Sequence, residues 1–259
     1  MNKHIQIFQP NFTGRDFVVG DIHGCIKEFN KALWSVGFDK SVDRVFSVGD
    51  LVDRGPESLK CLDLLMEPWF HAVKGNHEIL WYNAHMDSYT YSDRYIFLHN
   101  GGEMVENEEL VKKYSSLIES MPYLIELTLK SGKRVGIIHA EIPTYVDSWE
   151  KLKEIIENDI SPDRSSNVDT HPISSLIWGR SRIYKFKAAQ YNDKAFPEIE
   201  GIDEIYVGHT IVPEPVKYQQ FNYIDCGAFL PYWLSEEHLT RKKESGKYGE
   251  PRLVIKELK

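Results

Sequence analysis

Cysteine is scarce in this sequence, and long apolar runs are missing from it. The three cysteines, Cys25, Cys61 and Cys226, are too few and too far apart for a disulfide framework, and they fit a reducing compartment. No apolar run approaches the roughly 20 residues that a membrane-spanning helix needs, and residues 1–6 lack the apolar core of a signal peptide. We therefore expect a cytoplasmic protein without a membrane partner.

Positive charge is also in short supply. The 31 Lys and Arg residues are outnumbered by 39 Asp and Glu residues, which gives a formal net charge of -8 and argues against a nucleic-acid partner. An anionic substrate remains compatible with this balance, because a local cluster of metal ions and arginines can reverse the field. With 42% hydrophobic residues, the chain of 259 residues is large enough for one catalytic domain that spans residues 1–259. The sequence does not indicate an oligomeric state.

Short apolar segments alternate with amphipathic ones in the first third of the chain. Each short segment is followed by glycine and polar residues and then by a stretch with apolar residues at helical spacing. This order predicts three βα units and a parallel sheet. The expected strands are 16–19, 44–48 and 70–73, and the expected helices are 26–36, 57–66 and 79–86.

The remaining chain predicts further strands and helices without an internal repeat. We expect a helix at 108–120, a hairpin from strands 124–129 and 134–138, a strand at 204–207 and an edge strand at 252–258. Asp147 and Glu150 predict a capping box for another helix. Residues 158–171 are polar and predict a surface loop, and the whole segment 145–200 is expected to shape substrate access.

Polar side chains follow several of these strands at the point where each strand ends. Histidine, carboxylate and amide oxygen are ligands for divalent Mn, Fe or Zn, and the absence of thiolates argues against a structural zinc site. Seven such groups exceed what one ion needs and suit two ions about 3.5–4 Å apart, which predicts one bridging carboxylate. Asp50, on the middle strand, is the natural bridge. The seven residues are Asp21, His23, Asp50, Asn76, His77, His139 and His209.

Three sequence blocks resemble the signature of a known family. They are Gly20-Asp-Ile-His-Gly24, Gly49-Asp-Leu-Val-Asp-Arg-Gly55 and Gly75-Asn-His-Glu78. Together with the downstream His139-Ala and Gly208-His-Thr, they are similar to the phosphoprotein phosphatases, within the metallophosphoesterases. Details such as Ile177-Trp-Gly-Arg180 resemble the compact bacterial and bacteriophage-lambda-type serine/threonine phosphatases. The resemblance implies an α/β, calcineurin-like fold, in which a two-sheet β-sandwich is flanked by helices.

The resemblance also implies a role for each residue of the site. Two divalent ions, most simply Mn with Fe or Zn as alternatives, would activate a hydroxide between them that attacks phosphorus directly. His77 would protonate the leaving group and Asp53 would orient it. Arg54 and Arg180 would hold the phosphate, with Arg182 as a substitute for Arg180. The metal ligands would be Asp21 and His23 for one ion, Asp50 for both, and Asn76, His139 and His209 for the second.

Three functions are compatible with this pattern. The first is hydrolysis of phosphoserine and phosphothreonine in proteins, with phosphotyrosine as a further substrate. The second is nucleotide hydrolysis similar to that of the symmetrical diadenosine tetraphosphatases. Those enzymes usually have alanine where Asp53 stands and aspartate where Glu78 stands, so both positions favour the first function. The third is an inactive phosphatase-fold binding protein, which predicts a missing ligand or acid, and none is missing.

Two further residues near the blocks have expected structural roles. Glu78 is expected to stabilise backbone groups or Arg54 rather than to take part in the chemistry. Cys25 follows the first block directly, and a small core residue is the favoured interpretation over an oxidisable thiol.

Overall fold

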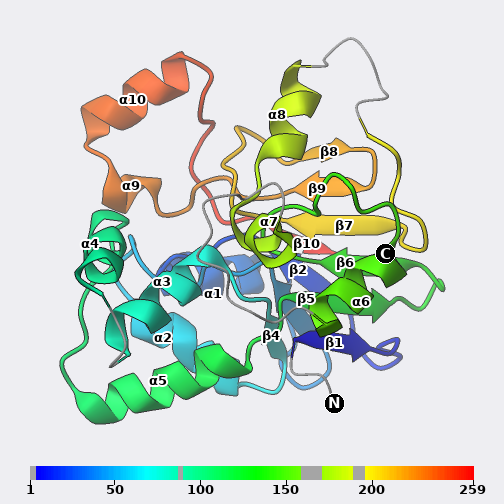
Figure 1. Ribbon diagram of the computed structural model, residues 1–259, viewed down its shortest axis with the longest axis horizontal. Coiled ribbons are helices and arrows are strands. Elements are labelled where there is room, and N and C mark those ends of the chain that lie inside the picture. Colours follow the sequence, from blue (N-terminus) through cyan, green and yellow to red (C-terminus); the bar gives the residue numbers. More distant parts are fainter. Residues whose placement is uncertain (1–3, 87–89, 159–170, 189–195) are drawn as a thin grey trace.

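Two β-sheets packed face to face organise the computed structural model, which describes residues 4–86, 90–158, 171–188 and 196–259 (Figure 1). Buried apolar side chains from the facing surfaces of both sheets pack against one another and form a core between the sheets from which water is excluded. From one sheet these are Val18, Phe46, Val48 and Val73, and from the other they include Ile125, Leu127, Val135, Ile137 and Tyr206.

The four-stranded sheet has the order β10-β2-β3-β4. Strands β2 (Asp16–Val19), β3 (Arg44–Ser47) and β4 (Phe70–Ala72) are parallel, as the three predicted βα units require. β10 (Ile255–Glu257) pairs antiparallel with β2 and forms the predicted edge strand. All four residues of β2 are buried, which explains why the strand lacks alternation between polar and apolar positions.

The six-stranded sheet has the order β1-β5-β6-β7-β9-β8. The predicted hairpin is confirmed, because β5 and β6 pair antiparallel, and β6, β7 and β9 then run parallel to one another. β1 adds in parallel to β5 at one edge, and β8 pairs antiparallel with β9 at the other. The strands are β1 (Ile5–Phe8), β5 (Leu124–Thr128), β6 (Arg134–Ile137), β7 (Glu204–Val207), β8 (Val216–Tyr218) and β9 (Phe221–Tyr223).

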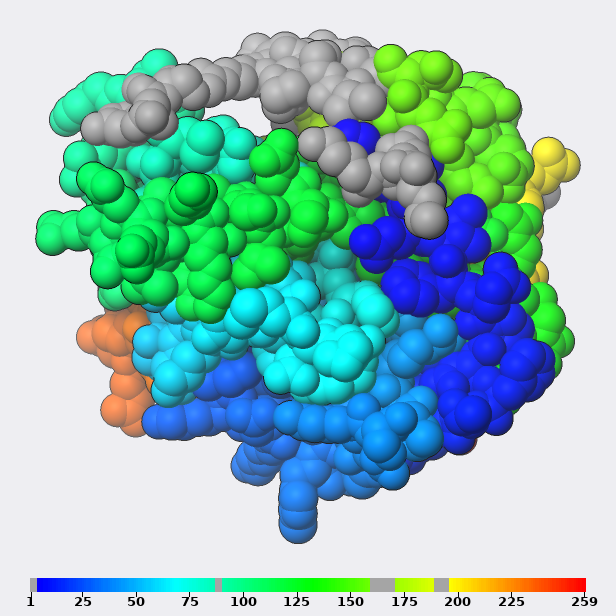
Figure 2. Space-filling model, turned by 90° about the horizontal axis from the view of Figure 1, so that it is seen from below, coloured from blue at the N-terminus to red at the C-terminus, as the bar shows by residue number. Residues whose placement is uncertain are grey.

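Helices from the first half of the chain cover the outer face of the four-stranded sheet. They bury Phe29, Leu62, Trp81 and Ile118 against it, and Figure 2 shows α2 and α5 side by side on this face of the molecule. These helices are α1 (Ile26–Ser35), α2 (Ser58–Asp63) with a 3₁₀ turn (Leu64–Met66), α3 (Asn76–His85), α4 (Tyr91–His99) and α5 (Glu108–Ser120).

The other helices lie against the six-stranded sheet or beyond it. Trp149 and Leu152 of α6 and Leu176 of α7 pack against Ile205 and Val207, which completes a sandwich flanked by helices. The elements are α6 (Trp149–Asn158), α7 (Pro172–Trp178), α8 (Ser181–Ala188), α9 (Leu230–Trp233) and α10 (Glu236–Glu244). Among the described residues, every helix is too short or too polar to cross a bilayer.

Three details differ from the sequence-based expectations. The helix expected at 57–66 changes to a 3₁₀ turn after Asp63, and its last residue, Met66, is 54% exposed rather than buried. The helix α3 begins at Asn76 and not at residue 79. At the start of α6 the backbone N–H of Lys151 donates to Ser148 Oγ, so Ser148 and not Asp147 is the capping residue. The loop expected at 158–171 lies almost entirely outside the described residues.

Candidate metal centre

Chain segments from both sheets converge at one edge of the sandwich. The segments follow β2, β3 and β4 in one sheet and β6 and β7 in the other, and each carries residues expected in the site. Parallel strands present their carboxyl ends at the same edge, which is where α/β sheets bind ligands. The early start of α3 places Asn76 and His77 in the first turn of a helix, where the backbone holds them.

Four donor atoms meet in the first of two clusters. Asn76 Oδ1 lies 3.0 Å from His139 Nε2 and 2.8 Å from His209 Nδ1, and the two ring nitrogens are 3.2 Å apart. Asp50 Oδ1 lies 3.4 Å from His139 Nε2. Atoms about 2.1 Å from a common ion are separated by about 3–3.4 Å in octahedral or tetrahedral coordination, so these spacings fit a ligand shell.

The ring tautomers support this interpretation. His139 Nδ1 lies 2.8 Å from the carbonyl oxygen of Val48, and His23 Nδ1 lies 2.7 Å from that of Val52. A carbonyl oxygen can only accept, so both neutral rings carry their proton on Nδ1 and direct a lone pair from Nε2 into the site. For His139 that lone pair faces Asn76 Oδ1, another acceptor, which is unfavourable unless a cation lies between them.

Asp50 also belongs to the second cluster. Its Oδ2 lies 3.4 Å from His23 Nε2, while Oδ1 faces His139, so one carboxylate reaches both clusters as a bridging ligand must. Asp21 Oδ1 is buried without a partner among the described residues, although Oδ2 accepts from the backbone N–H of His209 at 2.9 Å. His77 joins this cluster, because one of its ring nitrogens lies within 4.8 Å of a donor atom of His23 and of Asp50.

Electrostatics in this enclosed site favour a cation. Burial raises the pKa of Asp50 to about 7, and burial together with the charge of Asp225 raises the pKa of Asp21 well above its ordinary value. Burial lowers the pKa of His139 to about 4, which keeps the imidazole in the neutral form that binds metals. Two divalent ions would offset the desolvation of the carboxylates, so the residues present fit a dinuclear centre.

Backbone strain is concentrated in these loops. Six described residues other than glycine have φ in the left-handed region, and five of them belong to the expected site. Such conformations cost on the order of 1 kcal/mol or more each, and they persist where surrounding contacts enforce them. The five are His23, Asp50, Asp53, Arg54 and His209, with φ of 44°, 51°, 70°, 70° and 62°.

Glu78 explains how the loop after β3 keeps this conformation. Its Oε2 accepts from the backbone N–H groups of Asp50 and Gly75, at 3.0 and 2.8 Å, and its Oε1 accepts from that of Leu51 at 2.7 Å. The side chain is fully buried. Of the two expected roles, backbone stabilisation therefore applies and no contact with Arg54 is found in the described structure.

Close packing around the centre requires glycine at two positions. A Cβ on Gly75 would lie 2.2 Å from Asp50 Oδ1, and one on Gly208 would lie 1.8 Å from Asp21 Oδ1. Both distances are far below van der Waals contact. The glycines of the third block and of the Gly208-His-Thr segment therefore leave room for the carboxylates themselves.

His77 and Asp53 form a buried pair beside the second cluster. His77 Nδ1 lies 2.7 Å from Asp53 Oδ2, and Nε2 is buried without a partner among the described residues. The backbone N–H of His77 donates to Asp50 Oδ1 at 3.0 Å, which fixes the pair relative to the centre. Burial lowers the pKa of His77, and burial with the charges of Glu78 and Asp50 raises that of Asp53.

Arginine side chains stand at the mouth of the site. Arg54 Nη1 lies 3.1 Å from His23 Nε2, and its guanidinium stacks 4.5 Å from the ring centroid of Phe229. Arg180 donates from Nη2 to the carbonyl oxygen of His209 at 3.3 Å. Arg182 is fully buried and donates to the carbonyl oxygens of Ile142 and Pro143, so the expectation that it could replace Arg180 is wrong.

Asp225 is a residue of the site that sequence reasoning did not include. It follows β9, is 2% exposed, and accepts from the backbone N–H of Gly227 at 2.8 Å. Burial raises its pKa to about 6, and its charge is near enough to raise the pKa of Asp21. Its position directly after an apolar strand was the available signal.

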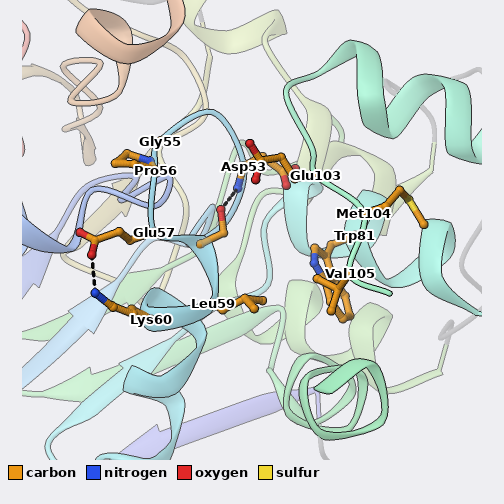
Figure 3. Close-up of a pocket in the computed structure, with 11 residues that line it drawn as sticks. Asp53, Gly55, Pro56, Glu57, Leu59, Lys60, Trp81, Glu103, Met104 and Val105 are labelled. Carbon is orange, nitrogen blue, oxygen red and sulfur yellow. Dashed lines mark hydrogen bonds and ion pairs between the residues drawn. The ribbon is translucent and has the colours of Figure 1, made fainter. Parts of the chain in front are cut away.

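A cavity and a buried cysteine lie beside the centre. A cavity of about 580 Å³ lies behind Asp53, between Glu57, Glu103 and an apolar wall that includes Trp81 (Figure 3). Cys25 is fully buried against Phe229, and burial raises the pKa of its thiol to about 12. The burial of Cys25 confirms its interpretation as a core residue.

A family model described as calcineurin-like phosphoesterase matches residues 17–213, which covers both clusters and the two arginines. The chain belongs to this family. The family match accounts for the convergence of carboxylate, amide and imidazole donors at the end of the sandwich, because metallophosphoesterases use such a centre.

Curated relatives of this metallophosphoesterase are similar over most of its length. Serine/threonine-protein phosphatase 1 of Salmonella typhimurium (strain LT2) is 32% identical over 217 residues, which cover 82% of this chain and 86% of the relative. Serine/threonine-protein phosphatase 2 of Escherichia coli (strain K12) is 31% identical and covers 82% and 87%. A symmetrical bis(5'-nucleosyl)-tetraphosphatase of Aromatoleum aromaticum is 45% identical, but over 65 residues, 24% of each chain.

Solved structures support the fold of this metallophosphoesterase. A protein serine/threonine phosphatase from Saccharomyces cerevisiae superposes with a TM-score of 0.54 at 14% identity and covers 99% of this chain and 84% of its own. A mutant of a cold-active protein tyrosine phosphatase gives a TM-score of 0.51 at 12% identity and covers 97% and 76%. At such identities the likeness concerns architecture alone.

Proposed function

We propose that this metallophosphoesterase hydrolyses phosphoserine and phosphothreonine in proteins, with phosphotyrosine as a further substrate. The similarity to two serine/threonine-protein phosphatases over more than four fifths of the chain supports this substrate class. The dinucleotide alternative has support from a much shorter match. Manganese is the metal we expect in the site, with Fe or Zn as alternatives.

Each expected ligand has a place in the proposal. Asp21 and His23 would hold one ion, and Asp50 would bind both ions. The remaining ligands of the second ion would be Asn76, His139 and His209. When bound, the two ions supply positive charge beside the phosphoryl group and lower the pKa of the attacking water. Arg54 and Arg180 would bind the phosphoryl oxygens, and their planar guanidinium groups can each donate two parallel hydrogen bonds.

The contact between His77 and Asp53 is the observation that carries the proposal. Serine and threonine alkoxides are poor leaving groups and need a proton as the P–O bond breaks, whereas a nucleotide phosphate leaves readily without one. His77 would donate this proton from Nε2, the atom without a partner among the described residues. Asp53, 2.7 Å from Nδ1, would orient the ring and stabilise the imidazolium before transfer.

A substrate panel tests the proposal. Purified full-length protein with Mn²⁺ would be incubated with a phosphoserine peptide, a phosphotyrosine peptide and diadenosine tetraphosphate. We expect phosphate release from the phosphoserine peptide at the highest kcat/KM, and a loss of that activity in Asp50→Asn. Cleavage of the dinucleotide alone would replace the proposed function with the nucleotide alternative, and no hydrolysis of any substrate would favour the binding-protein alternative.

A further inference from the structure

The cleft that contains Arg54 and Arg180 extends well beyond the metal centre. It has a volume of about 710 Å³, which is enough for several residues of a peptide rather than a phosphate group alone. Its far walls come from α8, from α9 and from the segment that follows α10, and α8 and α10 project from the same side of the sandwich (Figure 1). Much of this wall lies after residue 213, where the match to the family model ends.

The charged residues that line this cleft all favour anions. Besides Arg54 and Arg180 they include Lys187 on α8 and Lys247 after α10, and no Asp or Glu is among the described lining residues. This is unusual on a chain with a formal net charge of -8. The cavity behind Asp53 has the opposite character, because Asp53, Glu57 and Glu103 all line it. A one-sign field of this kind concentrates anionic ligands in the cleft.

In the described structure, no carboxylate pairs with Lys187 or Lys247. Neither forms an ion pair within the described part of the chain, whereas Lys153 and Lys217 are paired with Glu126 and Glu204. The amine of Lys247 instead lies 5.6 Å from the ring centroid of Tyr248. Partial burial lowers the pKa of Lys187. Both cations are therefore available to a ligand in the cleft.

Aromatic side chains line the same cleft as the two lysines and the arginines. Tyr184 is 58% exposed and Trp233 is 43% exposed, and both line the cleft together with Tyr218 and Tyr248. Such rings present flat apolar surfaces and, in tyrosine, a hydroxyl group, which suits an extended peptide.

We propose that the outer cleft binds acidic side chains adjacent to the phosphorylated residue of a peptide substrate, with Lys187 and Lys247 as its specificity-determining residues. This rests on the proposed function, since it needs a phosphopeptide in the site. The phosphoryl group would lie against Arg54 and Arg180, and glutamate or aspartate residues of the peptide would reach the two lysines. Exposed ion pairs are weak individually, so both lysines together should give a preference of about tenfold.

A peptide series tests this inference on the full-length protein with Mn²⁺. One phosphoserine peptide would be made with glutamate, alanine or lysine at the flanking positions, and p-nitrophenyl phosphate, which has no flanking residues, would serve as the common reference. We expect kcat/KM to be about tenfold higher for the glutamate peptide than for the alanine peptide, with the difference chiefly in KM. The lysine peptide should be the poorest, and added salt should reduce the differences.

The double variant K187Q/K247Q should bring the ratio between glutamate and alanine peptides close to one. Lys185→Gln is the matched control, because Lys185 lies on the same helix but faces Phe196, 4.8 Å from its ring centroid, and does not line the cleft. It should keep the preference. Thermal unfolding of all variants checks that they are folded.

Three results would overturn the inference. If phosphopeptides are hydrolysed without regard to flanking charge, or if the double variant keeps the preference, the outer cleft does not select acidic residues while the proposed function stands. If phosphopeptides are not hydrolysed and diadenosine tetraphosphate is, the proposed function fails as well. A loss of dinucleotide cleavage in K187Q/K247Q would then assign the lysines to additional phosphates.

Discussion

His77 is the residue whose replacement distinguishes acid catalysis from metal binding. In His77→Asn we expect kcat for a phosphoserine peptide to fall on the order of 10²-fold or more, because the alkoxide then leaves without a proton. Hydrolysis of p-nitrophenyl phosphate should fall much less, because p-nitrophenolate is a good leaving group. Steady-state kinetics of both substrates at saturating Mn²⁺ provide the measurement.

The ratio of the two losses carries the information. Asp53→Asn should reproduce the pattern, since Asp53 contacts His77 Nδ1 at 2.7 Å. His99→Asn is a suitable control, because its exposed side chain stacks on Tyr95 and belongs to neither of the two clusters. Equal losses for both substrates in His77→Asn would instead assign His77 to the metal ligands. Its ring lies in the same group of potential ligands as His23 and Asp50.

Glu78 is predicted to stabilise the loop after β3 through its side chain alone, and a single substitution tests this. Glu78→Gln replaces one of two acceptor oxygens with an amide that cannot accept, so at least one of the N–H groups of Asp50, Leu51 and Gly75 loses its partner. We expect a loss of about 2–3 kcal/mol in the free energy of unfolding. Urea denaturation in the presence of a chelator measures it without a metal contribution.

The exposed Glu109 on α5 gives the comparison for this loss. Glu109→Gln should change the free energy of unfolding by less than about 0.5 kcal/mol. If Glu78→Gln is no less stable than Glu109→Gln, the three backbone contacts do not stabilise the loop.

At the scale of secondary-structure elements, the side chain of Glu126 connects two strands and a helix. On β5, it accepts from Arg134 of β6 at 2.8 Å, from Trp149 Nε1 at 2.9 Å and from Lys153 Nζ at 3.0 Å, the last two on α6. Although burial raises its pKa, these hydrogen bonds outweigh it, so the pKa lies below its ordinary value of 4.5. The carboxylate thus stabilises the fold above about pH 4.5 and loses that contribution as pH falls through the folded-state pKa.

We therefore expect Glu126→Gln to be less stable than the parent protein by about 1–2 kcal/mol at pH 7. The difference should shrink as pH is lowered below 4.5, because the parent carboxyl group then becomes protonated. Denaturation curves of both proteins between pH 7 and pH 3.5 measure the gap. A gap that stays constant or widens towards acid pH would contradict this account.

The helices and strands that could be predicted from the sequence are those with buried apolar residues at regular spacing. Strands β2 and β7 and helix α5 were predictable because burial of Phe17 and Val207, or of Tyr114 and Ile118, gives each a clear pattern. Helix α4 was not predicted, since Phe97 is its one buried residue and its tyrosines are exposed. Three-residue β8 depends on pairing with β9, and α10 has no buried residue, so neither leaves a local pattern.

The convergence of the candidate ligands was more predictable than the elements around them. These ligands lie at strand ends within short blocks, and the fold brings strand ends together. Arg182 and Asp225 show the limit, because the burial of one and the placement of the other depend on distant contacts. Arg182 is enclosed by the backbone of Ile142 and Pro143, 40 and 39 residues away. Asp225 approaches Asp21 from the opposite end of the chain.

The proposed ligands are divided between the two sheets of the molecule. Asp21, Asp50 and Asn76 follow strands of the four-stranded sheet, and His139 and His209 follow strands of the six-stranded sheet. Ions held by both sets would join the sheets at the edge of the sandwich. Because such a site does not exist in the unfolded chain, binding free energy becomes folding free energy.

Metal should therefore raise the thermal stability of the whole molecule. At a Mn²⁺ concentration of about 100 times Kd, each bound ion contributes a stabilisation of about 2.7 kcal/mol. For a chain of this size that corresponds to an increase in Tm on the order of 5–10 °C for each ion, relative to the protein with a chelator. His139→Asn should lose the part of this increase that the second ion provides, and Lys185→Gln, which alters a residue outside both clusters, should keep all of it. An identical Tm with Mn²⁺ and with chelator, or an undiminished increase in His139→Asn, would show that the two sheets are not joined by metal at these residues.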